Sequence, residues 1–414
     1  MRTGRAPHTI LVGSMCGGLL LLAPSGNPAN ALGRVDAMAA PPQTSRVVDQ
    51  VIHDACDKRV ALLGESPTHG FGRTLNLKVE IVQRLVQECH YDAFFIESGA
   101  YDFLNIQSRL ASGRPITGAM IAAAIGGIWA TQEVEPLIPF LLARAQRGAL
   151  VLGGLDDQLA RGTWAQREMP ADLVQDLHGP DKEECLAILR RHALWQYTNE
   201  APYGPSDKAR ILRCIGLVSA RLSESRQTPA GQYRADMLEN LKRVLARDFA
   251  DGATGPYDAA RDFNARDRSM YANFRWLLSR LPRGSKVIVW TAVVHAAKDL
   301  SAVPGDENRV PLGSYVRRDF ASDAFALGIS ALAGTYALGR QPVRTLPAAP
   351  PGSLEARAFA GNTFDVSYLS AAQLEAIGRA PARLAGPDFR TAQWSRVLDG
   401  LVVFREERPP RARQ

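Results

Sequence analysis

Short apolar runs that end in polar residues constrain the fold of this chain more than any other feature. The runs at 60–63, 94–96, 150–152 and 287–290 are apolar, and charged residues or histidines follow each within a few positions. Between the first two runs, apolar residues recur four apart from 77 to 85, which is helical spacing. Strands that alternate with helices predict an α/β fold with a mainly parallel central sheet flanked by helices.

The polar residues after these runs predict where a functional site lies. Glu65 and His69 follow the first run, Glu97 follows the second, and His295 follows the run at 287–290. In an open α/β sheet, ligands bind outside the carboxyl ends of the strands. We therefore expect these four side chains to meet in one water-accessible site.

The first part of the chain has the pattern of a secretory signal peptide. Two arginines precede an apolar stretch at about 9–22, and the small residues at 29–31 offer a cleavage site. We expect residues 1–31 to be removed and the protein to be periplasmic or extracellular. Lipid attachment at Cys16 is an open alternative. No later run approaches the roughly 20 apolar residues of a spanning helix, so no stable membrane insertion is expected after signal removal.

The remaining chain divides by its patterns. Residues 45–160 are predicted to form the first part of the α/β core, and residues 283–405 the second part. Between them the strand pattern disappears and helical stripes dominate, which predicts a helical insertion at 161–282. Residues 406–414, with several arginines and two prolines, are expected to be a flexible tail.

Four cysteines lie beyond the expected cleavage point: Cys56, Cys89, Cys185 and Cys214. An exported protein permits disulfides. Each neighbouring set lies on the apolar faces of predicted helices, so we expect Cys56 to pair with Cys89 and Cys185 with Cys214. Four buried thiols are the alternative. The absence of a C-x-x-C pair disfavours a zinc site.

The distribution of charge along the chain indicates which classes of partner the protein can bind. The net charge of +7 is spread along the chain and not concentrated with aromatic residues on one segment. Nucleic-acid binding is therefore not expected. The sequence makes no prediction about oligomeric state.

Two common hydrolytic routes leave motifs that are absent here. The chain has neither the G-x-S-x-G of serine hydrolases nor the H-E-x-x-H of metalloproteases. A histidine near carboxylates remains, and such a group suits the direct activation of water. A positioned base contributes about 10²–10⁴ in rate.

An ordered series of segments resembles the motifs of the erythromycin esterase family. The series covers most of the chain between about 60 and 335. Its members are GESPTHG at 64–70, Lys78, FFIESGAYD at 94–102, WATQE at 129–133, NARDRSMYAN at 264–273, VIVWTAVVHAAKD at 287–299 and VPLGSYVRRDF at 310–320.

The resemblance implies an α/β core with a helical insertion, and hydrolysis in which a histidine acts as general base on water without an obligatory metal or other cofactor. Position by position, His69 is the implied base, Glu65 and Glu97 are the assisting carboxylates, and His295 is the histidine after the late strand.

Three further residues in these motifs are expected to bind substrate. Arg266 is expected to contact the substrate or its oxyanion. Trp129 and Glu133, one helical turn apart if that segment is helical, are expected to line the site.

The chain departs from the family pattern at two places. Pro67 makes the spacing from Glu65 to His69 one residue longer than in many members, which puts their contact in question. In the late motif, Ala292 and Val293 occupy inner positions where many members have W-x-H-N-x-H. A macrolide substrate is therefore not implied, and a role in antibiotic resistance stays an open possibility.

Three hypotheses follow from these residues. The first is an exported esterase or lactonase with His69 as the base and a small-molecule ester as substrate. The second is a divalent-metal hydrolase that uses the same Glu and His side chains as ligands. The third is a periplasmic small-molecule binding protein that has lost turnover, which the alanine at position 292 favours.

Overall fold

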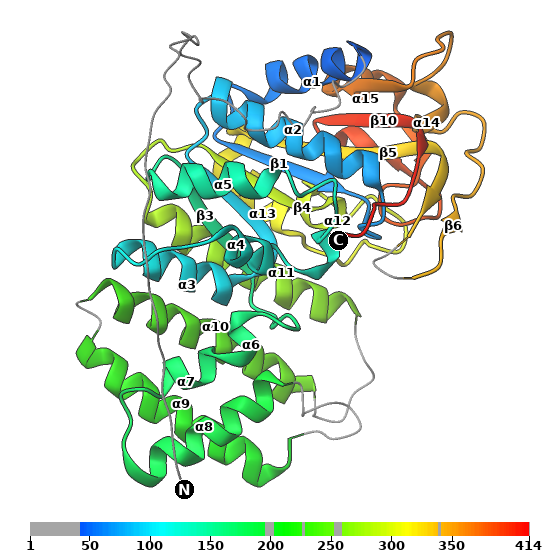
Figure 1. Cartoon of the computed structure of the whole chain (residues 1–414). Helices are drawn as coiled ribbons and strands as arrows, with labels where there is room; N and C mark the ends of the chain where they lie inside the picture. The colour runs from blue at the N-terminus through cyan, green and yellow to red at the C-terminus, as the bar shows by residue number, and fades with distance from the viewer. Residues whose placement is uncertain (1–41, 195–202, 226–227, 252–258, 338–340, 414) are drawn as a thin grey trace, which may run out of the picture. The chain divides into compact units, whose positions relative to one another are not determined.

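A computed structural model describes residues 42–194, 203–225, 228–251, 259–337 and 341–413. Its central sheet has eight strands in the order β3-β2-β4-β1-β5-β10-β7, with β6 paired to β5 (Figure 1). The strands are β1 Val60–Glu65, β2 Ala93–Gly99, β3 Val151–Asp156, β4 Val287–Ala292, β5 Ala324–Tyr336, β6 Arg344–Thr345, β7 Val366–Ser370 and β10 Gly400–Glu407. All pair in parallel except β6 and β7, so the predicted α/β class with a mainly parallel sheet is confirmed.

Helices occupy most of the remaining described chain. They are α1 Pro42–Ala55, α2 Gly72–Glu88, α3 Ala100–Ala111, α4 Gly118–Ile125, α5 Leu137–Gln146, α6 Trp164–Arg167, α7 Met169–Leu173, α8 Gly179–Ala193, α9 Pro205–Ser225, α10 Pro229–Asp251, α11 Ala259–Ser279, α12 Val293–Ala296, α13 Leu312–Phe320, α14 Leu354–Arg357 and α15 Ala371–Ile377. Three short 3₁₀ helices are η1 Gly127–Trp129, η2 Ala321–Asp323 and η3 Trp394–Arg396. A small two-stranded sheet pairs β8 Arg379–Ala382 with β9 Arg390–Gln393.

The sheet is buried on both faces. In β1, Ala61 and Leu63 belong to the apolar core on one face, whereas Val60 and Leu62 belong to the core on the other. Successive side chains of a strand point to opposite faces, so a strand covered on both sides is apolar throughout. This explains why the sequence shows continuous apolar runs and not alternation.

One glycine lets a site helix pack against the end of β1. A Cβ atom on Gly64 would lie 2.7 Å from the Cα of Val293 and 2.9 Å from the carbonyl oxygen of Leu327. Only a residue without a side chain permits this approach of backbones. Helix α12, which carries His295, therefore lies directly beside the carboxyl end of β1.

Helices α6 to α11 lie between β3 and β4 in the sequence (Figure 1). Helices α6 to α10 carry most of a separate apolar cluster, to which Tyr101 and Leu104 of α3 also belong. Disulfides join Cys185 to Cys214, between α8 and α9, and Cys56 to Cys89, at the ends of α1 and α2. Both predicted pairings are confirmed. Among the described helices, none has the length and apolar character needed to cross a membrane.

The segment expected to be a flexible tail, 406–414, is held in place over its described part. Glu406 and Glu407 belong to β10, and Thr131 forms a β-bridge with Ala412. The prediction failed because the arginines of this segment are not all solvated. Arg411 pairs with the buried Glu133, a partner 278 positions away that local composition does not reveal.

Candidate functional site

The carboxyl end of β1 holds the first half of the candidate site. Glu65 is the last residue of β1 and is buried, and its Oε1 lies 2.8 Å from the Nδ1 of His69. Oε1 also accepts a hydrogen bond of 2.6 Å from the indole Nε1 of Trp129. The extra residue Pro67 therefore does not separate the pair. His69 has a φ of 50°, a left-handed conformation that is uncommon outside glycine and that often marks functional turns.

A buried lysine completes this half. Lys78 on α2 lies 3.3 Å from the Oε2 of Glu65 and 4.1 Å from the ring centre of Trp290. Burial is the largest influence on the pKa of Lys78 and lowers it to about 8, against the opposing effect of Glu65. Burial alone would raise the pKa of Glu65, but Lys78 and the hydrogen bonds from His69 and Trp129 lower it overall. Glu65 is therefore an ionised carboxylate that holds the ring of His69.

The second half of the site is built around Glu97, near the end of β2. Its Oε1 lies 3.2 Å from the Nε2 of His295 and 3.0 Å from the Nη2 of Arg266. Its Oε2 accepts hydrogen bonds from the hydroxyl of Thr291, at 2.7 Å, and from the backbone N–H of Ala292, at 2.8 Å. Ala292, at an inner position of the late motif, thus contributes its backbone N–H to the site as a hydrogen-bond donor to Glu97.

Two more carboxylates surround this half. Asp267 on α11 lies 2.9 Å from the Nδ1 of His295, and Asp156 at the end of β3 lies 2.6 Å from the Nη2 of Arg266. Burial by itself lowers the pKa of His295, but Glu97 and Asp267 outweigh it and raise the pKa to about 10. His295 is therefore an imidazolium at neutral pH, beside the guanidinium of Arg266.

The two halves are connected through β4. Lys78 donates to the carbonyl oxygen of Thr291 at 3.3 Å, and the hydroxyl of the same threonine donates to Glu97. Burial would raise the pKa of Glu97, yet His295, Arg266 and, to a smaller extent, His69 hold it well below its ordinary value.

Solvent reaches this cluster at two side chains. The side chain of His69 is 13% exposed and that of Arg266 is 22% exposed. The carboxylates of Glu65, Glu97 and Asp267 are almost fully enclosed. Within this cluster, the ring of His69 and the guanidinium of Arg266 are therefore more open to solvent than the acids.

The two remaining predicted residues, Trp129 and Glu133, differ in whether they contact the site. Trp129 contacts the site, because its indole bonds to Glu65 and its ring lies edge-on to that of His69 with 5.3 Å between centroids. Glu133 is not brought to the cluster, since its oxygens accept from the backbone N–H and the Nε of Arg411. The expected helical turn between the two is also wrong. Trp129 ends η1, and Glu133 lies in the turn that follows.

Four contributors were not selected from the sequence. Lys78 and Asp267 stand inside the quoted motifs but carried no predicted role, and Asp156 follows the apolar run at 150–152 but has the sequence context of a helix-capping residue. Phe263, whose ring stacks on that of His295 at 5.0 Å, precedes its motif by one position. The available signal was periodicity, because Phe263, Arg266, Asp267 and Met270 share one face of α11.

The pairing of the charged side chains can be compared with what the metal hypothesis requires. In the ranges that the structure describes, no group of three or more His, Cys, Asp or Glu side chains is arranged to hold a metal ion. The acids are paired with cations instead, Glu65 with Lys78, and Glu97 with Arg266. A metal-dependent site would need these pairs to rearrange.

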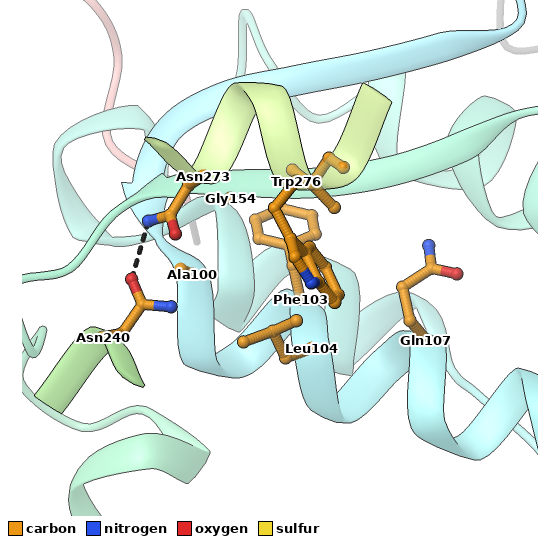
Figure 2. A pocket seen from close by; sticks show the side chains of 9 residues that line it. Ala100, Phe103, Leu104, Gln107, Gly154, Asn240, Asn273 and Trp276 are labelled. Carbon is orange, nitrogen blue, oxygen red and sulfur yellow. Dashed lines mark hydrogen bonds between the residues drawn. The ribbon is translucent and has the colours of Figure 1, made fainter. Parts of the chain in front are cut away.

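A small cavity lies to one side, among α3, β3, α10 and α11. It measures about 10 Å³, room for roughly one water molecule. Figure 2 shows Phe103, Leu104 and Trp276 around it, and the hydrogen bond of 2.6 Å between Asn240 and Asn273. Its size excludes an ester substrate, so this cavity is a small packing gap where α10 and α11 meet α3 and β3.

Comparisons with known proteins agree with this geometry. The sequence model of the erythromycin esterase family matches residues 86–406 of this chain. The Bacillus subtilis (strain 168) protein named "Putative hydrolase YbfO" is 22% identical over 296 residues, which are 67% of this chain and 66% of that protein. The chain thus spans just under two thirds of that relative's length.

Solved structures share the fold. A mutant of the erythromycin esterase EreC in its open conformation superposes with a TM-score of 0.63 at 16% identity, over 88% of this chain and 95% of that one. A succinoglycan biosynthesis protein gives a TM-score of 0.68 at 14% identity, over 88% and 92% of the two chains. With the family match over most of its length, the chain belongs to the erythromycin esterase family, and the family and the named relative indicate a hydrolase.

Proposed function

We propose that this protein is an exported hydrolase that cleaves an ester or lactone bond, with His69 as general base on a water molecule. The observation that carries the proposal is the pair of His69 and Glu65. A carboxylate only accepts hydrogen bonds, so Glu65 fixes the proton on Nδ1 at 2.8 Å and leaves Nε2 as the acceptor. No partner of Nε2 is found among the described residues, and the ring is partly open to solvent.

The reaction proceeds in two steps. Nε2 of His69 takes a proton from water while the oxygen of that water attacks the carbonyl carbon, which gives a tetrahedral oxyanion. The intermediate then collapses, the bond to the leaving oxygen breaks, and His69 returns its proton to that oxygen. The products are an acid and an alcohol, or one hydroxy acid from a lactone.

The second half of the site supplies positive charge. His295 is held as an imidazolium between Glu97 and Asp267, and it therefore lacks the lone pair that a base needs. Arg266 lies beside it and is partly open to solvent. Fixed cations at a developing oxyanion stabilise it most where water is excluded. We assign His295 and Arg266 this role, with Glu97 positioning both.

Export is part of the proposal. The two disulfides are compatible with an oxidising compartment, where such bonds persist. The segment interpreted as a signal peptide, 1–31, lies outside the described residues. Mass analysis of the mature protein, recovered from the periplasm or the medium, tests this point directly.

A substrate panel tests the activity. Purified protein, treated with or without a strong chelator, is assayed on aryl esters, aliphatic esters, simple lactones and macrolides. The proposal predicts hydrolysis of at least one class, unchanged by chelation, and no covalent acyl adduct in the mass of the protein.

Each competing hypothesis gives a different result in this panel. Loss of activity on chelation, restored by a divalent ion, supports the metal hypothesis. Tight binding of a panel member without turnover supports the binding-protein hypothesis. An acyl adduct on the protein contradicts direct attack by water.

A further inference from the structure

The segment 408–413, here named the strap, lies against two loops that are far apart in the sequence. The first loop, 66–72, carries His69, and the second, 126–133, carries Trp129. Both residues contact Glu65, so the geometry of the proposed base depends on how these two loops are held relative to each other.

The strap contacts the first loop at its end. The backbone N–H of Gly72 donates to the carbonyl oxygen of Arg408 at 2.8 Å, and a Cβ atom on Gly72 would lie 3.0 Å from the carbonyl oxygen of Pro409. Just before the strap, the buried Glu407 accepts from the backbone N–H groups of Arg73 and Thr74 at 3.0 and 2.7 Å. The first turn of α2, which directly follows the loop of His69, is thus fixed from the end of β10.

The second loop is held by backbone pairing. The N–H of Gln132 donates to the carbonyl oxygen of Arg411 at 2.9 Å, and the N–H of Arg413 donates to that of Ala130 at 3.3 Å. These bonds flank the β-bridge between Thr131 and Ala412. The strap therefore acts as an additional strand beside the residues that immediately follow Trp129.

One ion pair locks this contact. The side chain of Glu133 is fully enclosed, whereas that of Arg411 is 58% exposed. The carboxylate oxygens of Glu133 accept from the Nε and the backbone N–H of Arg411, both at 3.0 Å. Burying an unpaired charge is unfavourable, so an enclosed carboxylate that loses its cation is favoured to move toward water. We therefore expect removal of the Arg411 side chain to displace the chain that follows Trp129.

We propose that Arg411 is a positioning residue for the hydrolytic site, and that it acts through Glu133, Trp129 and Glu65 on the ring of His69. This inference rests on the proposed role of His69 as the base. It also assigns to Glu133 a role in holding the loop of Trp129.

The test compares Arg411→Ala with a matched control, Arg408→Ala. Both variants remove one arginine side chain from the strap, but the side chain of Arg408 makes no hydrogen bond or ion pair with the described residues. Each variant is assayed for kcat and KM on the best ester of the panel. Because small displacements of catalytic groups lower the rate steeply, we expect Arg411→Ala to reduce kcat ~10–100-fold with KM changed less than ~3-fold. Arg408→Ala should stay within ~2-fold of wild type.

A spectroscopic readout separates positioning from general destabilisation. The chain has seven histidines, so the ring signals of His69 in ¹⁵N-labelled protein are assigned by their loss in His69→Gln. We expect these signals to shift in Arg411→Ala and to stay in place in Arg408→Ala. Arg411→Lys, which keeps the charge, should recover part of kcat, and Glu133→Gln combined with Arg411→Ala should lose less than Arg411→Ala alone.

The inference is overturned if Arg411→Ala and Arg408→Ala are equally active, or if Arg411→Ala melts earlier while the His69 signals stay at their wild-type positions. If wild type hydrolyses no ester, the proposed function fails, yet the His69 signals still test whether Arg411 positions that ring.

Discussion

Replacing Asp267 with asparagine should remove one of the two carboxylates that raise the pKa of His295 while it preserves the local shape. The amide introduced by Asp267→Asn keeps an oxygen for the backbone N–H of Leu312, which donates to Asp267 Oδ1 at 2.7 Å in the wild type. That oxygen also lies 3.0 Å from the Nδ1 of His295 in the wild type and can still accept its hydrogen bond. The change is therefore mainly one of charge at a fully buried position.

The size of the effect follows from the contacts of His295. Its pKa is raised from 6.5 to about 10, which corresponds to roughly 5 kcal/mol in favour of the imidazolium. Glu97 at 3.2 Å and Asp267 at 2.9 Å both raise it, and burial opposes both. The opposition of burial persists in Asp267→Asn. We therefore expect the pKa of His295 to fall to ~8 or below, a loss of ~2–3 kcal/mol.

Nuclear magnetic resonance titration of labelled histidine rings measures this shift directly. Wild type should keep the ring of His295 protonated beyond pH 9, whereas Asp267→Asn should titrate near neutrality. If the imidazolium stabilises the oxyanion, kcat/KM of the variant relative to wild type should fall as the pH rises from 6 to 9. Asp49→Asn, which removes a carboxylate that is 60% exposed, is the control and should change neither quantity. A pKa for His295 within half a unit of wild type in Asp267→Asn would refute the reasoning.

Three further predictions concern stability. Lys78→Met should destabilise the fold by ~3–5 kcal/mol in urea unfolding, because it leaves Glu65 buried without a cation; a loss below ~1 kcal/mol would show that Glu65 does not depend on this lysine. The pKa of His295 is higher in the folded state than its unfolded value of 6.5, so its contribution is complete below pH 6.5 and is lost as the pH rises through about 10. The urea midpoint of wild type should therefore fall more between pH 7 and 9 than that of His295→Gln, and parallel curves would contradict this. Replacing Cys185 and Cys214 with serine should cost ~3–4 kcal/mol, as expected for a closed loop of about 30 residues, and an unchanged thermal midpoint would be inconsistent with the disulfide.

Features encoded locally were predicted well from the sequence. The strands that carry Glu65 and Glu97 are continuous apolar runs because both faces of the sheet are covered, and a polar residue at such a strand end is visible without coordinates. The disulfide pairs were predicted for a similar reason, since each joins neighbouring helices through their apolar faces.

Features that depend on distant partners were not predicted. Asp267 becomes the partner of His295 only because α11, which follows α6 to α10 in the chain, packs beside the strand ends that carry the site. Glu133 was expected to line the site, but its partner Arg411 lies 278 positions away in a segment whose composition suggested a solvated end. Side-chain pairing across such separations depends on tertiary packing, which neither periodicity nor composition records.

The family resemblance already implied His69 as the base, but the role of His295 required the structure. His69 and His295 each follow a strand and each lie near carboxylates in the sequence. In the fold, His295 lies between two acids, whereas His69 contacts one acid that is itself paired with Lys78 and hydrogen-bonded to Trp129. This difference makes His69 the candidate base and His295 the candidate cation.

The most direct test of the account is the value of kcat/KM for His69→Gln on the best ester substrate, measured beside wild type at the same pH. If His69 is the base that activates water, kcat/KM should fall by at least ~100-fold while the ring signals of His295 remain at their wild-type positions. A value within about tenfold of wild type would contradict the account, because hydrolysis would then proceed without the proposed base.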